Sequence, residues 1–218
     1  MCTGRTTVKG VVHIMKSRNT LLRVSFYVIG LLLFSLGITL TIYADIGVSS
    51  WDAVSIGLYD RFGFSIGTWM TMISISQIIL GSLLNKERIH LESFLISIAM
   101  GTMVDGFTYG LSYISALFTG HSAIVYACGV AVIAIGCGTY LTANYLPATI
   151  DYFMLSIKRR YSFSISVSML LCEGIGLIFA FLFKGPVGYG TVIATLLYGP
   201  LIDLAHVSAT KLYKRLSN

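Results

Sequence analysis

The sequence contains few charged residues. Asp, Glu, Lys and Arg make up 11% of its 218 residues, whereas a soluble domain has about 25%. Apolar residues account for 56% of the chain, and the mean hydropathy is +0.82. A chain with so few charged residues cannot form a water-soluble surface. We therefore predict an integral membrane protein surrounded by lipid.

The sequence also lacks the common catalytic motifs. It has no G-x-x-x-x-G-K-[ST], H-E-x-x-H or G-x-S-x-G, which argues against a nucleotide-driven motor, a metalloprotease and a serine hydrolase. The segments between apolar runs are too short to form a core. We therefore expect no enzyme activity and no cofactor. The four cysteines have no metal-ligand spacing, so we expect small buried side chains and no metal site: Cys2, Cys128, Cys137 and Cys172.

Six apolar runs are long enough to span a bilayer: residues 24–44, 64–84, 92–117, 122–144, 163–183 and 187–206. With the N-terminus inside, 13 Lys and Arg residues lie on the inner side and two, Arg61 and Lys184, on the outer side. The positive-inside rule then predicts a cytoplasmic N-terminal segment, residues 1–23, and a cytoplasmic basic tail, residues 207–218. This arrangement explains the net charge of +6 without nucleic acid.

A polar stretch occurs twice. Residues 44–66 resemble residues 143–165 at a constant offset of 99, and residues 30–84 aligned on 129–183 share 11 identities in 55 positions. Chance would give roughly four in so biased a chain. After a slip of one residue, Gly101 matches Gly199 and Asp105 matches Asp203. The sequence therefore contains two related halves.

Each half, 24–117 and 122–206, holds three spans, so the second half enters the membrane from the opposite face. We predict an all-α membrane protein of about six transmembrane helices in two inverted-topology repeats, an arrangement that places transporter sites between the halves. Val48–Leu58 would measure about 16 Å as a helix. Each repeated insert, 45–62 outside and 145–162 inside, is therefore expected to form a half-membrane or interfacial helix.

The repeated stretch also has a family resemblance. Its first copy reads Ala44-Asp45-Ile46-Gly47-Val48-Ser49-Ser50-Trp51-Asp52, then Gly57-Leu58-Tyr59 and Ser65-Ile66-Gly67-Thr68-Trp69. This pattern resembles the YczE/YyaS/YitT-type multipass membrane proteins of bacteria, most of all the YczE type, over residues 22–206. The resemblance implies a location in the bacterial plasma (inner) membrane and implies no particular activity. The second copy departs from the pattern at Leu146 and Ile150.

Three acidic residues lie well inside the apolar runs, away from their first residues. An ionised carboxylate at mid-membrane costs about 2.5–3.5 kcal/mol and needs compensation. Asp105 and Asp203 could bind a cation or proton as a symmetry-related pair, or could accept hydrogen bonds from helix N–H groups and hydroxyls as structure. Glu173, whose counterpart is Ser74, could face a wet cavity or bond a neighbouring helix. The pair Gly106 and Gly110 predicts a close helix contact.

The two inserts carry a second set of candidates. Asp52 and Asp151 recur just past Ser50 and Thr149, which occupy N-cap positions. Capping alone could explain both carboxylates. Alternatively, the two short helices present these groups, together with Ser49, to a solute. Four aromatic residues near the outer boundary indicate a membrane-interface belt: Trp51, Trp69, Tyr43 and Tyr59.

Two functions are consistent with these features. The duplication and the intramembrane acids favour a small secondary transporter or channel for a small solute or ion. A non-transporting accessory protein that supports a partner complex in the membrane is the alternative. Homodimer formation is compatible with either. The sequence does not identify a solute, a coupling ion or a direction.

Overall fold

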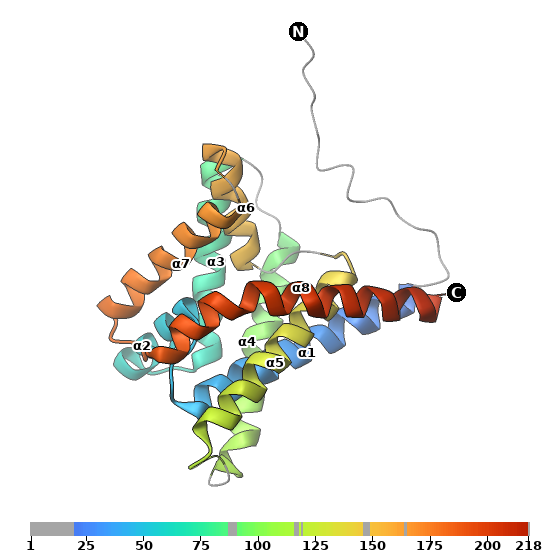
Figure 1. Ribbon diagram of the computed structural model, residues 1–218. Helices are drawn as coiled ribbons and strands as arrows, with labels where there is room; N and C mark the ends of the chain where they lie inside the picture. Colours follow the sequence, from blue (N-terminus) through green and yellow to red (C-terminus); the bar gives the residue numbers. More distant parts are fainter. Residues whose placement is uncertain are drawn as a thin grey trace.

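The computed structural model describes residues 20–86, 91–115, 118, 120–145, 149–163 and 165–217. Within this part of the chain every regular element is an α-helix (Figure 1). The helices are α1 (Thr20–Ala44), α2 (Ser50–Phe62), α3 (Ile66–Asn85), α4 (Leu91–Ser112), α5 (Ser122–Thr142), α6 (Thr149–Tyr161), α7 (Ile165–Leu182) and α8 (Tyr189–Ser217). The prediction of an all-α protein is confirmed.

Helix length and composition agree with a membrane protein. In the described residues, α1, α3, α4, α5 and α8 are long and apolar enough to cross a bilayer, and Val167–Leu182 of α7 forms a shorter apolar helix. Helices α2 and α6 have 13 residues each, or about 20 Å, which is too short to cross. Helix α8 continues to Ser217 as one helix, so residues 207–217, expected as a separate tail, extend its last turns.

The two halves repeat their elements at the offset seen in the sequence. Helices α2 and α6 begin at Ser50 and Thr149, and α3 and α7 begin at Ile66 and Ile165, so both pairs are separated by 99 residues. Each short helix packs against the third helix of the other half, α2 against α7 and α6 against α3. The halves are therefore interlocked.

Helices α1 and α5 cross in antiparallel directions at glycines that are equivalent in the two halves. A Cβ on Gly136 would lie 2.4 Å from the Phe34 nitrogen and 2.8 Å from the Gly30 oxygen. A Cβ on Gly37 would lie 2.6 Å from the Ile133 nitrogen and 2.9 Å from the Gly129 oxygen. Because only hydrogen fits at these points, glycine allows the two backbones to touch.

Among the described residues, the helix contact expected at Gly106 and Gly110 is not found. A Cβ at either position would have nothing within 4 Å in the described residues. The close approach in this region lies instead between α3 and α4, where a Cβ on Gly67 would overlap the Gly101 carbonyl and a Cβ on Gly101 would overlap Thr71. The spacing of glycines on one helix does not say which face meets a neighbour.

This contrast predicts opposite effects of one substitution. Gly136→Ala is expected to destabilise the protein by about 1–3 kcal/mol, because the new methyl group overlaps the α1 backbone. Gly106→Ala is the matched control and should be neutral or stabilising by up to about 1 kcal/mol, since it adds helix propensity in open space. Thermal denaturation of the purified protein in detergent measures both. Equal effects would contradict the assigned α1–α5 contact.

Candidate functional site

All eight helices contribute to one cavity of about 180 Å³. Its walls are mostly apolar, and four methionines and two cysteines line it: Met70, Met100, Met154, Met169, Cys137 and Cys172. Two carboxylates, Asp52 and Glu173, belong to the lining, while none of the described lining residues is Lys, Arg or His. The described lining therefore contains two acidic groups and no basic one.

Asp52 belongs to the first turn of α2. The Ser49 Oγ donates to the Asp52 carboxylate at 2.7 Å and accepts from the Asp52 backbone nitrogen at 3.3 Å. Ser49 is therefore the N-cap, and the expectation that Ser50 has this role is wrong. Capping explains why α2 begins here, but it uses only part of the acceptor capacity of Asp52, which is 9% exposed and still borders the cavity.

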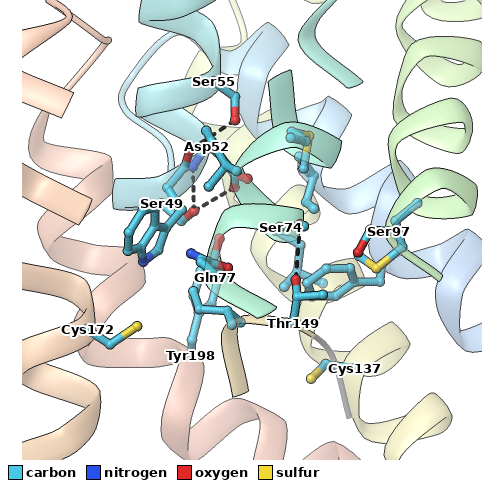
Figure 2. A pocket seen from close by; sticks show the side chains of 18 of the residues that line it. Ser49, Asp52, Ser55, Ser74, Gln77, Ser97, Cys137, Thr149, Cys172 and Tyr198 are labelled. Atoms are coloured by element: carbon cyan, nitrogen blue, oxygen red, sulfur yellow. Dashed lines mark hydrogen bonds between the residues drawn. The ribbon is translucent and has the colours of Figure 1, made fainter. Parts of the chain in front are cut away.

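Two hydrogen bonds join the halves beside the cavity. The Ser50 Oγ, released from capping, donates to the Glu173 carboxylate. The Thr149 Oγ1 donates to the Ser74 Oγ at 3.0 Å (Figure 2). Ser50 and Thr149 are equivalent positions, and so are Ser74 and Glu173. The same interaction therefore occurs twice, with a carboxylate in one copy and a hydroxyl in the other.

Three buried polar atoms at the cavity have no hydrogen-bond partner among the described residues. They are Gln77 Nε2, Trp51 Nε1 and Tyr198 Oη. Gln77 is 3% exposed, and Figure 2 draws it within the group of labelled polar side chains that includes Ser49, Asp52 and Tyr198. A buried donor left unpaired costs about 1–3 kcal/mol, so these atoms lie where a bound molecule could accept from them.

Sequence reasoning missed Gln77 and assigned Trp51 differently. Trp51 was expected in an outer aromatic belt, but its ring lines the cavity, and a Cβ on Gly176 would lie 2.9–3.0 Å from it. That glycine of α7 gives the indole its space. Gln77 was detectable in principle, because it is an amide within an apolar run.

The remaining candidates do not join this cavity. Asp105 accepts from the Gly67 backbone nitrogen at 2.7 Å and from the Ser65 hydroxyl, so it caps α3, as the structural alternative predicted. Asp203 is exposed on α8. Neither acid is among the residues that line the cavity. The side chain of Asp151 lies outside the described residues. Of the eight candidates, Asp52, Glu173, Ser49 and Thr149 line the cavity, and Ser50 bonds to it through Glu173.

Long apolar helices around a buried, partly polar cavity define an all-α integral membrane protein. The chain belongs to a family of unknown function, DUF6198, whose model matches residues 21–207. This confirms the resemblance given above.

Curated relatives cover most of the chain. The uncharacterized protein YyaS of Bacillus subtilis is 30% identical over 182 residues, which are 82% of this chain and 90% of the relative. The uncharacterized membrane protein YczE of the same organism is also 30% identical, over 83% of this chain and 84% of the relative. An uncharacterized protein of Haemophilus influenzae is 29% identical over 80% of this chain and 81% of the relative. No solved structure matches significantly.

Proposed function

We propose that the protein is a small secondary transporter or channel for a small solute or ion, built from two inverted repeats of three spans each. One observation carries the proposal: a cavity lined by both halves is bordered by the equivalent bonds Ser50–Glu173 and Thr149–Ser74. A site at the junction of inverted halves is the arrangement used by many transporters.

The cavity lining supports the repeat. Seven pairs of lining residues are separated by 99 positions, so equivalent residues of both halves face the same space: Phe34 and Ile133, Ile38 and Cys137, Trp51 and Ile150, Ser55 and Met154, Met70 and Met169, Ile73 and Cys172, and Ser74 and Glu173. Such pairing is expected when an approximate two-fold axis passes through a cavity.

The short helices make equivalent contacts in the two halves, as the proposed repeat requires. Helix α2 packs against the C-terminal end of α7, where a Cβ on Gly57 would touch the Phe183 oxygen at 2.7 Å. Helix α6 packs against the C-terminal end of α3, where Tyr152 bonds Ser82 at 3.1 Å. If α3 and α7 both cross the membrane, in opposite directions as the inverted arrangement requires, the two short helices lie near opposite membrane faces.

A difference between the halves favours a transporter over a channel. Helices α3 and α4 touch at Gly67 and Gly101. In the second half, α7 extends away from α8 (Figure 1), and a Cβ on Gly199, the counterpart of Gly101, would have nothing within 4 Å in the described residues. If the first half can adopt the separated arrangement while the second half adopts the packed one, the two halves swap conformations. Such a swap would open the cavity first to one side of the membrane and then to the other.

The orientation that we propose follows the positive-inside rule in the bacterial plasma (inner) membrane, with both termini cytoplasmic. Two contacts support it. Phe26 near the start of α1 lies 5.3 Å from Tyr213 near the end of α8, measured between ring centroids. Arg23 bonds the Ala143 oxygen at the end of α5 at 3.0 Å. The basic ends of α1 and α8 therefore lie together.

Flux in proteoliposomes tests the function. Vesicles containing the purified chain are loaded with radiolabelled small cations, amines or neutral solutes, and release is followed over time. Glu173→Gln and Asp52→Asn are expected to lower flux of any transported solute at least tenfold, because they remove the two acidic groups that line the cavity. The exposed acid Asp60 lies in the same helix as Asp52, so Asp60→Asn is the matched control and should retain flux.

The accessory function gives a different result. If no solute crosses and crosslinked pull-down recovers one partner in stoichiometric amount, the transport proposal is wrong. If flux occurs but Glu173→Gln and Asp52→Asn leave it unchanged, the cavity is not the path.

A further inference from the structure

The two acidic groups that line the cavity favour a positively charged ligand. Asp52 and Glu173 each receive a hydroxyl hydrogen bond, from Ser49 and Ser50, and an ionised carboxylate has about four acceptor sites. Acceptor capacity therefore remains on both groups. Because no described lining residue is basic, any charge that these acids carry is balanced by what enters the cavity. A cation meets this condition, and an anion would be repelled.

The residues that line the cavity favour an organic cation over a hard metal ion. Calcium needs six to eight oxygen ligands and magnesium a near-ideal octahedral set, and the described residues contain no group of three or more His, Cys, Asp or Glu that could hold a metal. The lining instead offers aromatic rings from Phe34, Trp51, Tyr140 and Tyr198 together with thioethers. Aromatic faces attract weakly hydrated ammonium groups.

The unpartnered donors require an acceptor on the same ligand. Gln77 Nε2 and Trp51 Nε1 are N–H donors only, and neither has a partner in the described residues. Gln77 is 3% exposed and borders the cavity. A bare ammonium ion would leave both donors unsatisfied, whereas a hydroxyl or carbonyl oxygen would accept from them. The cavity therefore combines a site for positive charge with a site for an oxygen atom.

The volume limits the size of this ligand. The cavity has a volume of about 180 Å³. Drug-sized sites are larger, about 300–1,000 Å³. A small molecule therefore fits this cavity better than a drug-sized one.

We propose that the cavity binds a small organic ammonium ion with an acceptor oxygen, of the amino-alcohol type. Asp52 and Glu173 face the ammonium group, the aromatic rings enclose its methyl or methylene groups, and Gln77 and Trp51 donate to the oxygen. This inference rests on the proposed function, since it assigns the chemical class of the solute that the same cavity takes.

Ligand-induced stabilisation of the full chain in detergent tests the class with three matched probes. Choline carries both features, 3,3-dimethylbutan-1-ol is its neutral carbon isostere, and tetramethylammonium lacks the oxygen. Choline should raise the melting temperature in a saturable manner. Both comparison compounds should need at least tenfold higher concentrations for the same shift, because each lacks one of the two interactions.

Variants separate the two interactions. Asp52→Asn and Glu173→Gln should weaken choline binding at least tenfold, and Asp60→Asn should not. Gln77→Leu should remove most of the preference for choline over tetramethylammonium while tetramethylammonium still binds. Trp51→Phe keeps an aromatic ring without the N–H group and should likewise reduce the preference for choline over tetramethylammonium.

Several results would overturn the inference. These are equal binding of choline and its neutral isostere, unchanged choline binding in both acid variants, or a response to Na⁺ with none to choline or ethanolamine. If these organic cations fail to bind while the proteoliposomes release another solute, the ligand class is wrong and transport stands. If no solute crosses either, the proposed function fails as well.

Discussion

A cysteine in place of Asp60 is expected to react with a membrane-impermeant maleimide added outside intact cells, and a cysteine in place of Arg159 only after the inner face is exposed. The two positions are 99 residues apart, near the ends of α2 and α6, and both are exposed. Inverted repeats place equivalent positions on opposite faces. The expected difference in labelling is therefore close to complete.

The labelling experiment requires a chain without its native thiols. Cys137 and Cys172 are buried and Cys128 is exposed, so all native cysteines are first replaced by serine or alanine and folding is checked. Inside-out vesicles give the reciprocal measurement, in which Arg159→Cys labels and Asp60→Cys does not. Labelling of both positions from one face would exclude the inverted arrangement and remove the main support for transport.

Crosslinking is expected to capture two exclusive states of the protein. Thr71 of α3 donates to the Ser97 oxygen of α4 at 3.2 Å, so Thr71→Cys with Ser97→Cys should crosslink through a short thiol-reactive reagent. The equivalent positions in the second half are Leu170 and Thr195, and both are exposed. If the halves exchange conformations, Leu170→Cys with Thr195→Cys should crosslink only when α3 and α4 have separated.

Flux through the crosslinked protein tests whether transport requires both states. Locking either pair should abolish flux by at least a hundredfold, and reduction of a cleavable crosslinker should restore it, because a transporter must visit both states. Pairs placed within a single helix, Ser76→Cys with Leu80→Cys, control for modification itself. Crosslinking of both pairs in the same molecule at once would contradict an exchange. Full flux through the locked protein would favour a channel.

The helices were largely predictable because their determinants are local. Long apolar runs without charge form helices in lipid, where every backbone polar group must find its partner within the segment. The offset of 99 predicted that α2 and α6 begin at equivalent residues, and they begin at Ser50 and Thr149. The short length of the inserts likewise follows from counting residues against bilayer thickness.

Local sequence patterns failed where a face or a partner had to be chosen. Ser49 and Ser50 are adjacent and chemically identical, yet Ser49 caps α2 and Ser50 reaches Glu173, because a helix rotates neighbouring side chains by about 100°. Asp105 was an equally good candidate for binding. The N-terminus of α3 lies beside it, however, and the Gly67 backbone N–H donates to the Asp105 carboxylate.

The sequence by itself determined the membrane class, the helical architecture and the duplication, since hydropathy and repetition are properties of the chain in order. Only the tertiary structure decided which polar groups converge. Gln77, Trp51, Asp52 and Glu173 come from three helices, and their meeting at one cavity depends on how α2, α3 and α7 are packed. Each of them lies in a segment whose sequence equally permits exposure to lipid, to a neighbouring helix or to a ligand.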